Sequence, residues 1–265
     1  MDWFQAIFLA VLQGVVEFLP ISSSGHLILV PALLGWDDQG LGFDIAVHFG
    51  TLMAVLGYFR DDIRDMAAGW YASLRGAPMS GDARLAWAVI LGTVPLAFAG
   101  AVVGAWFSSD LRSPGIIAAA TAGFGIVLWI ADRSSRHARD EHTLRWRDVL
   151  AIGVGQTLAL IPGTSRSGIT MTVGLALGLT RAGAARFSFL LAIPAIAMAA
   201  VWELEHLLRD PDPVDWPVLG MATGVSAFTA YITIKLFMRL IQSMGMLVFA
   251  LYRLVLAAVI VYVLL

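Results

Sequence analysis

The stretch from residue 13 to residue 26 reads Gln13-Gly-Val-Val-Glu17-Phe-Leu-Pro20-Ile-Ser22-Ser23-Ser24-Gly25-His26. Its first half continues an apolar helical pattern, which Pro20 interrupts before a run of three serines. A carboxylate, several hydroxyls and an imidazole therefore lie within an otherwise hydrophobic region. Ionisable groups at membrane depth are costly and commonly mark a functional site. We therefore interpret this stretch as one half of a site around which the chain folds.

The composition is typical of an integral membrane protein. Of the 265 residues, 59% are hydrophobic and only 14% are charged, whereas soluble domains carry about 25% charged residues. The formal net charge of -2 gives no reason to expect a nucleic-acid partner. The chain has no cysteine, which excludes disulfides and thiolate nucleophiles. The first residues lack the basic segment of a cleavable signal peptide, so we expect the first helix to be retained.

Six segments are long and apolar enough to cross a bilayer core of about 30 Å, which needs roughly 20 residues. They cover about residues 43–60, 85–107, 114–131, 187–204, 217–238 and 246–265. Two further apolar regions, 3–35 and 149–179, are each broken in the middle by proline, glycine and serine. Irregular backbone at membrane depth must be buried in protein or line a wet cavity. We predict an all-α polytopic membrane protein with six transmembrane helices and two re-entrant helical hairpins.

The distribution of basic residues predicts an orientation. Thirteen of the 17 lysines and arginines fall in four segments, 60–84, 132–148, 179–186 and 235–245, whereas the opposite loops hold only Arg112 and Arg209. The positive-inside rule places the four segments in the cytoplasm and both termini outside. The first hairpin then enters from the outside and the second from the cytoplasm. We interpret the charges of 132–148 as a solvated surface near the lipid headgroups.

A weak internal repeat relates the two halves of the chain. With an offset of 143 residues, Gln13 aligns with Gln156, Ser22 with Ser165, Ser24 with Ser167 and Gly25 with Gly168. Two copies of one hairpin plus three spans must have opposite orientations, as the arginines also indicate. Inverted repeats bring their broken helices together near the bilayer midplane. We predict one membrane domain, 1–265, with repeat 1 at about 1–131 and repeat 2 at about 149–265.

The first polar stretch supports two kinds of chemistry. Gln13 and Glu17 share one helix face, and their oxygens suit Mg²⁺ or Ca²⁺; alternatively, Glu17 is a buried acid that a neighbour satisfies. A hydroxyl of the serine run near His26 is a candidate nucleophile. Alternatively, these serines cap the next helix, which we expect to begin near His26.

The second polar stretch, Gly163-Thr164-Ser165-Arg166-Ser167-Gly168, precedes an apolar half-helix. Backbone N–H groups and the positive end of a helix dipole then face the break. With a guanidinium and several hydroxyls added, the stretch suits a phosphate or pyrophosphate. Alternatively, Arg166 pairs with Glu17 across the repeat, and the two hypotheses are compatible. Arg253 is either a second phosphate contact or a partner of Asp44, and we interpret His48 as a satisfied core histidine.

These two stretches resemble the signature motifs of the undecaprenyl-pyrophosphate phosphatase family, the bacitracin-resistance membrane proteins of bacteria. The resemblance covers the whole chain, including Tyr252-Arg253 near its end. It implies hydrolysis of a C55 isoprenoid diphosphate to its monophosphate and inorganic phosphate, which renews the carrier lipid for peptidoglycan synthesis. It also implies Mg²⁺ or Ca²⁺ as cofactor, the bacterial inner membrane as location, and an active site that opens to the periplasm.

The resemblance also implies roles for individual residues. Glu17 matches the essential acid, Ser23 the proposed nucleophile, His26 the proposed base and Arg166 the pyrophosphate-binding arginine. Gln13 stands where many members have a second glutamate, which leaves Glu17 as the one charged metal ligand. Further substrate contacts are expected from Ser24, Thr164, Ser165, Ser167, Gly168 and Arg253. The sequence leaves open whether Ser23 or a water attacks phosphorus, and whether the chain forms a homodimer.

A second hypothesis is a lipid flippase or small-molecule transporter built on the same inverted repeat. Inverted repeats, broken helices and charges near the midplane are typical of transporters. The two hypotheses differ in one simple observable, because a pure transporter releases no inorganic phosphate from an isoprenoid diphosphate.

Overall fold

The computed structural model describes residues 2–37, 39–103, 113–209 and 215–265. In these ranges the chain forms eleven α-helices and no β-strand. Two short 3-10 helices, η2 (Glu141–Thr143) and η3 (Leu158–Leu160), flank α7. The α-helices are α1 (Trp3–Val16), α2 (Ser23–Leu34), α3 (Leu41–Tyr58), α4 (Arg60–Leu74), α5 (Gly81–Val103), α6 (Pro114–Ser134), α7 (Trp146–Thr157), α8 (Arg166–Ala176), α9 (Arg181–Arg209), α10 (Trp216–Leu240) and α11 (Leu247–Leu264).

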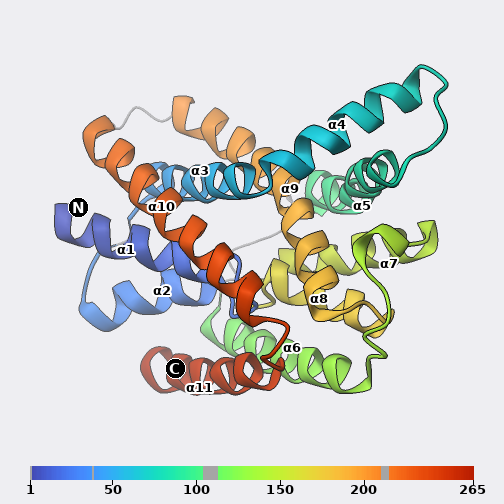
Figure 1. Cartoon of the computed structure of the whole chain (residues 1–265). Helices are drawn as coiled ribbons and strands as arrows, with labels where there is room; N and C mark the ends of the chain where they lie inside the picture. Colours follow the sequence, from blue (N-terminus) through green and yellow to red (C-terminus); the bar gives the residue numbers. More distant parts are fainter. Residues whose placement is uncertain (1, 38, 104–112, 210–214) are drawn as a thin grey trace.

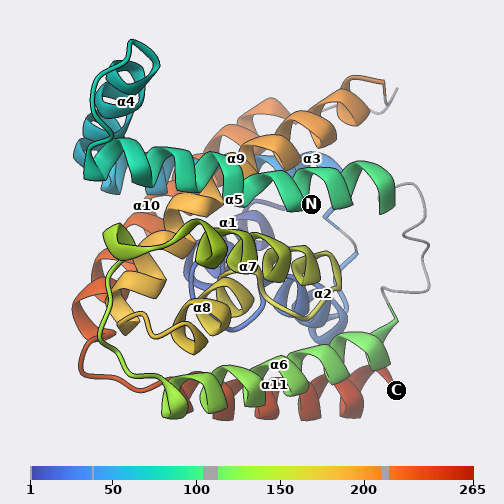
Figure 2. The same cartoon turned by 90° about the vertical axis from the view of Figure 1, so that its right-hand side faces the viewer.

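Six of these helices, α3, α5, α6, α9, α10 and α11, are long and apolar enough to cross a membrane. They coincide with the six predicted spans, so the prediction of an all-α polytopic membrane protein is confirmed. Figures 1 and 2 show the four short helices α1, α2, α7 and α8 between two groups of long ones. On one side lie α6 and α11, and on the other lie α3, α5 and α9.

The short helices form two consecutive pairs, α1 with α2 and α7 with α8, and in each pair a segment that we call an elbow separates the two helices. The first elbow covers residues 17–22 and the second covers residues 158–165. The two elbows end in the same local conformation. Ser22 and Ser165 have φ angles of 74° and 69°, which are rare for residues other than glycine. Each hydroxyl accepts the backbone N–H three residues later, at 3.4 Å from Gly25 and 3.1 Å from Gly168. These two serines are therefore helix N-caps. Because Ser22 is the cap, α2 begins three residues before the predicted position, and His26 lies in its first turn.

Helix contacts in the two halves correspond to one another. Helix α1 packs on α10 as α7 packs on α5, and α2 packs on α11 as α8 packs on α6. Helices α3 and α9 contact each other, as do α6 and α11. A two-fold repeat with its boundary between α6 and α7 would produce this pattern. The division into repeats at 1–131 and 149–265 stays a prediction.

Small residues and hydroxyls join the long helices. A Cβ atom at Gly50 of α3 would lie 2.4 Å from the carbonyl oxygen of Thr223 in α10. The hydroxyl of Ser226 in α10 donates to the carbonyl of Val47 at 2.8 Å. Close backbone approach and interhelical hydrogen bonds are what hold helices together in lipid, where apolar surfaces gain little from contact.

The segment 132–148 differs from its predicted role. Its carboxylates Asp132, Glu141 and Asp148 are buried, so the interpretation as a solvated surface is wrong for them. The ion pairs are Arg181–Asp132 at 2.6 Å, Arg186–Glu141 at 2.5 Å and Arg139–Asp148 at 2.5 Å. The segment folds back against the start of α9, and these pairs compensate the loss of hydration.

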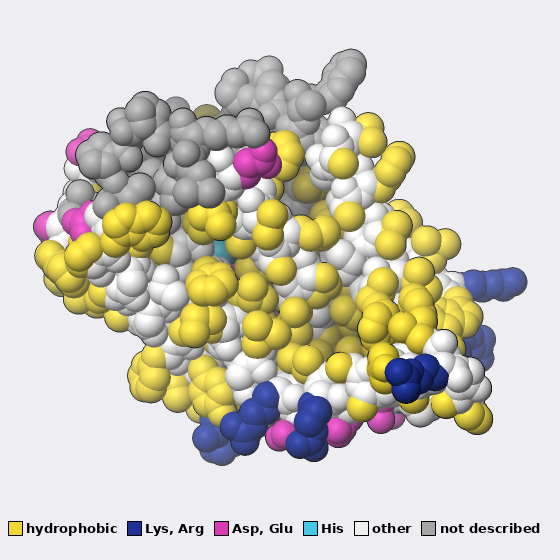
Figure 3. Space-filling view, turned by 90° about the horizontal axis from the view of Figure 1, so that it is seen from above, with side chains coloured by type: hydrophobic (Ala, Val, Ile, Leu, Met, Phe, Trp, Pro, Cys, Tyr) yellow, Lys and Arg dark blue, Asp and Glu magenta, His cyan; other side chains and the backbone are white. Residues whose placement is uncertain are grey.

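The two termini lie at one end of the molecule, and their outward orientation stays a prediction. Figure 1 shows both termini on the left and the loop between α6 and α7 on the right. In Figure 3, Lys and Arg gather along the lower and right-hand edges, with some Asp and Glu among them, and hydrophobic side chains are spread over the face between. Arg112 lies outside the described residues. Helix α4, which the sequence did not predict, projects from the basic end and packs on α5.

The absence of native cysteine allows a direct test of orientation. We expect Asp37→Cys, in the exposed turn after α2, to react with a membrane-impermeant maleimide in intact spheroplasts. Arg136→Cys, in the exposed loop after α6, should react only after permeabilisation, because the positive-inside rule places it in the cytoplasm. Both positions are solvent-exposed, so the reverse labelling pattern would contradict the predicted orientation.

Candidate active site

The two elbows meet directly in the centre of the molecule. The backbone N–H of Gly163 donates to the hydroxyl of Ser24 at 3.2 Å. In the other direction, the hydroxyl of Ser167 donates to the carbonyl of Leu19 at 3.0 Å. Residues about 140 positions apart in the chain thus form one connected polar centre, as the repeat predicts.

Arg253 holds the two elbows together. Its side chain is fully buried and donates to backbone carbonyls, not to the carboxylate of Asp44. The acceptors are Thr121 (2.8 Å), Gly163 (3.0 Å), Thr164 (2.9 Å), and at 3.4 Å Pro20 and Ala120. A Cβ atom at Gly168 would lie 2.8 Å from this guanidinium, so a larger residue there would require the guanidinium to shift. Arg253 therefore satisfies carbonyls of both elbows and of α6, and its predicted contact with substrate stays a prediction.

Glu17 and Arg166 form an ion pair between the two elbows. Their carboxylate and guanidinium atoms approach to 3.5 Å, which is the pairing that the sequence suggested. Gln13 donates to the other carboxylate oxygen at 3.0 Å, and Arg166 also donates to the carbonyl of Ser188 at 3.1 Å. Glu17 is 8% exposed and Gln13 is fully buried, so this ion pair is largely removed from solvent.

His48 is part of this centre, which corrects its interpretation as an ordinary core histidine. Its Nε2 atom lies 3.8 Å from the Glu17 carboxylate, and its Nδ1 atom lies 2.7 Å from the carbonyl of Asp44. A carbonyl can only accept, so Nδ1 carries the hydrogen. The sequence did carry a signal, because Asp44 and His48 are two ionisable residues one turn apart in a predicted span.

Several polar atoms around the elbows are buried without a hydrogen-bond partner in the described residues. They are the Oε1 atom of Gln13, the Oγ1 atom of Thr164, the Nη2 atom of Arg166 and both amide atoms of Gln156. An unsatisfied buried polar group costs about 1–3 kcal/mol. Such a concentration at one place indicates a site that a polar ligand completes, with Arg166 as a donor and Gln13 as an acceptor.

Ser23 is the serine of the first elbow whose hydroxyl is not engaged by the described residues. It lines a cavity of about 500 Å³ together with Ser24, His48 and Pro162. Ser22 caps α2 and Ser24 bonds to the second elbow, whereas the Ser23 hydroxyl has no hydrogen bond to the described residues. In the second elbow, Ser165 caps α8 and lies 3.2 Å from the Ser167 hydroxyl.

The hydrogen bonds of His26 within the described residues do not include Ser23. Its Nδ1 atom donates to the carbonyl of Ser22 at 2.7 Å, so its Nε2 atom accepts from the hydroxyl of Tyr252 at 2.6 Å. The two rings are also stacked, with centroids 5.6 Å apart. His26 thus links α2 to α11, and Tyr252 is a neighbour of the site that residue spacing alone did not reveal. The role of His26 as a base stays a prediction.

The donor set limits how a metal ion can be held. Within the described ranges no three His, Cys, Asp or Glu residues cluster. Glu17 and the unpartnered Oε1 atom of Gln13 supply one charged and one neutral oxygen. Proteins commonly hold Mg²⁺ with one or two carboxylates while substrate phosphates complete its shell. These residues therefore fit a divalent cation that is bound jointly with a diphosphate.

Comparison with known proteins agrees with this geometry. The family model described as bacitracin resistance protein BacA matches residues 6–259. The chain belongs to the BacA family. Undecaprenyl-diphosphatase 2 of Stutzerimonas stutzeri (strain A1501) is 54% identical over 98% of this chain and 97% of its own length. The undecaprenyl-diphosphatases of Nitrosococcus oceani and Thioalkalivibrio sulfidiphilus are 54% and 51% identical, over 99% of both chains in each case. Membership of the BacA family confirms the resemblance that the two motifs indicated.

Loss of the Arg253 guanidinium should destabilise the protein. We expect Arg253→Met to lower the apparent melting temperature in detergent by about 5–10 °C, because it strands buried carbonyls of both elbows. The melting temperature of Arg253→Lys should lie between those of wild type and Arg253→Met, because one ammonium group cannot reach the same set of acceptors.

The matched control for this measurement is Arg133→Met, which removes an exposed arginine and should change the melting temperature by less than about 1 °C. An unchanged melting temperature in Arg253→Met would contradict the conclusion that Arg253 holds the two elbows together.

Proposed function

We propose that the chain is an undecaprenyl-diphosphatase, which hydrolyses undecaprenyl diphosphate to undecaprenyl phosphate and inorganic phosphate. The observation that carries this proposal is the Glu17–Arg166 pair between the two elbows, in a member of the BacA family whose relatives carry that name over nearly the full chain. In the cell this reaction would return the carrier lipid to peptidoglycan synthesis and confer resistance to bacitracin.

The diphosphate would bind between the elbows. The Nη2 atom of Arg166, which lies 3.5 Å from Glu17, makes no hydrogen bond to the described residues, and α2 and α8 both begin at the elbows. The positive ends of these two helix dipoles and their free N–H groups favour an anion. Thr164, whose Oγ1 atom makes no hydrogen bond to the described residues, would be a further contact. Ser165, Ser167 and the backbone at Gly168 would also contact the diphosphate, once their present hydrogen bonds rearrange. The isoprenoid chain would remain among the apolar helices.

Ser23 would act at the terminal phosphorus. In one route its Oγ atom attacks, the bond to the bridging oxygen breaks, and undecaprenyl phosphate leaves. Water then hydrolyses the phosphoserine, which releases inorganic phosphate and restores the hydroxyl. In the other route Ser23 positions a water that attacks directly. In either route Glu17 or His26 accepts the proton, and His26 must first release the Tyr252 hydroxyl from Nε2.

Stabilisation of negative charge would come mainly from groups already in place. Arg166 and the helix N-termini oppose the charge on the transferring phosphoryl group and its leaving oxygen. Glu17 and Gln13 would hold Mg²⁺ or Ca²⁺. When bound, this cation would neutralise part of the diphosphate charge.

We place the protein in the bacterial inner membrane with the cavity open to the periplasm. The cavity beside Ser23 is also lined by Pro31, Ala32, Trp36 and Gln39, which lead into the turn between α2 and α3. That turn lies toward the end of the molecule where the N-terminus lies (Figure 1). The distribution of arginines places that end outside.

Phosphate release from undecaprenyl diphosphate by the purified protein in detergent tests the activity. We expect wild type to release phosphate with Mg²⁺ or Ca²⁺ and to lose most of this activity in EDTA. Glu17→Ala and Arg166→Ala should each lower kcat by about 100-fold or more, because each removes a charge at the reacting group. Wild-type protein that released no phosphate with any divalent cation would contradict the phosphatase and favour a transporter.

Ser23 and Ser22 offer a matched pair for the nucleophile. Ser23→Ala should lower kcat by about 100-fold with an unchanged melting temperature, because its hydroxyl faces the cavity. Ser22→Ala should instead cost about 1 kcal/mol of stability, because it removes a helix cap. Full activity in Ser23→Ala would exclude that hydroxyl from the reaction. Acid quench of labelled substrate distinguishes the two routes, since only covalent attack leaves phosphate on the protein.

A further inference from the structure

A basic cavity lies at the end of the molecule opposite the Ser23 cavity. Its volume is about 460 Å³, and it is located where α3 ends, α9 begins and α10 ends. The side chains that give it its character are Tyr58, Arg186, Tyr231, Lys235 and Arg239. None of them belongs to the two elbows, so the proposed phosphatase mechanism gives this cavity no role.

The positive charge of this cavity is only partly compensated. Arg186 is paired with Asp62 and Glu141. Lys235 and Arg239 are exposed and form no ion pair with any residue in the described ranges. The same place also presents the hydroxyls of Tyr58 and Tyr231, whose rings pack edge to face at 6.0 Å, and the first turn of α9. Two free cations, two hydroxyl donors and the positive end of a helix favour a phosphate group.

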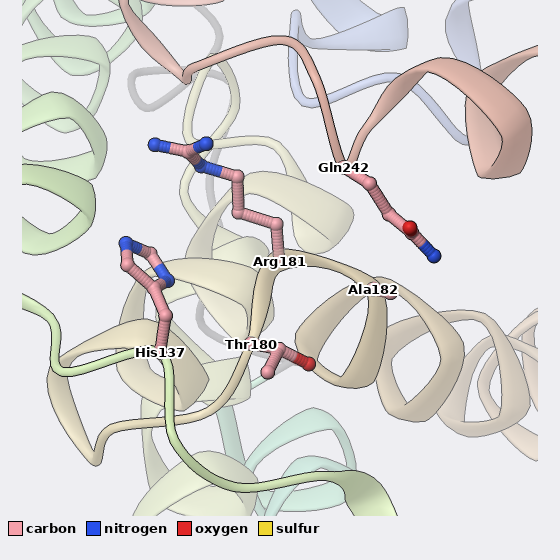
Figure 4. Close-up of a pocket in the computed structure, with 5 residues that line it drawn as sticks. All are labelled: His137, Thr180, Arg181, Ala182 and Gln242. Carbon is pink, nitrogen blue, oxygen red and sulfur yellow. The ribbon is translucent and has the colours of Figure 1, made fainter.

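The adjacent cavity provides a contrast. Its volume is about 430 Å³, and it is lined by His137, Thr180, Arg181, Ala182 and Gln242 (Figure 4). Arg181 donates two hydrogen bonds to Asp132, and His137 binds the carbonyl of the same residue. The charged donors of this second cavity are therefore already engaged by the protein. Of the two, only the basic cavity has uncompensated charge for a ligand.

The surface beside the basic cavity identifies the kind of molecule that carries the phosphate. Ile232, Leu236 and Leu240 are 39%, 49% and 46% exposed. They are spaced four residues apart, so they form an apolar stripe along α10, the helix that also carries Lys235 and Arg239. An apolar stripe that runs beside a basic cavity matches acyl chains joined to an anionic headgroup. Basic pockets between helices at the cytoplasmic side are suited to such headgroups.

We propose that the basic cavity binds the headgroup of an anionic phospholipid, whose acyl chains lie along the exposed stripe of α10. Native mass spectrometry of the full chain in neutral detergent tests this site. The delipidated protein is titrated with phosphatidylglycerol and, separately, with phosphatidylcholine. Wild type should prefer phosphatidylglycerol. The double variant Lys235→Gln/Arg239→Gln should bind it about tenfold more weakly while its binding of phosphatidylcholine stays unchanged, because each basic group near the surface contributes a several-fold factor.

The matched control is Arg133→Gln/Arg136→Gln, which makes the same change in charge on exposed residues outside the cavity, and which should keep the wild-type preference. Phosphate release by both variants in neutral detergent should stay within about twofold of wild type, so this test does not depend on the proposed phosphatase activity. Equal loss in the control, or no preference in wild type, would overturn the proposal. Displacement of phosphatidylglycerol by millimolar inorganic phosphate would overturn it in favour of a free-phosphate site.

Discussion

Where a helix breaks inside a bilayer, its backbone N–H and C=O groups lose their helical hydrogen bonds and find no water to replace them. The rest of this structure depends on the partners that these groups find within the protein. Two broken hairpins expose such groups at the same depth. On the carbonyl side, Arg253 donates to Gly163 and Thr164 of the second elbow, to Pro20 of the first elbow at 3.4 Å, and to α6. On the N–H side, Ser22 and Ser165 cap the following half-helices. Each elbow then completes the other through the Gly163–Ser24 and Ser167–Leu19 hydrogen bonds.

The same arrangement produces the candidate site. Once the elbows are locked together, α2 and α8 both begin at the centre, so two helix N-termini face one polar space. Glu17 and Arg166 come from different halves of the chain and meet there. Their pairing balances two charges that would each be costly alone. The Oε1 atom of Gln13 and the Nη2 atom of Arg166 still make no hydrogen bond to the described residues. A charged ligand loses its hydration water when it enters the site, and these two atoms can replace part of that water.

Charge is arranged differently at the centre of the molecule and at its basic end. At the centre, the charged groups of the site are Glu17 and Arg166, which form an ion pair. At the basic end, the carboxylates of Asp132, Glu141 and Asp148 form ion pairs with arginines. Two of these pairs tie the end of α6 and the loop after it to the start of α9, and the third ties this loop to the start of α7. The excess of basic residues that remains at this end is what membrane orientation requires and what an anionic lipid surface would meet.

The sequence alone determined the membrane class, the six spans and the two broken hairpins, because hydropathy over about 20 residues and the prolines and glycines that interrupt it are local properties. The polar character of the two elbows could also be predicted from the sequence, because charged and hydroxyl residues stand out in such apolar segments. Three features depended on the tertiary structure. Arg253 holds the two elbows together because carbonyl groups of both elbows lie within hydrogen-bonding distance of its guanidinium. His48 joined the site because α3 packs beside α1. His26 found Tyr252 as its hydrogen-bond partner because α11 packs on α2. Each of these is set by contacts between residues far apart in the chain, and no local pattern encodes which partner a buried polar group finds.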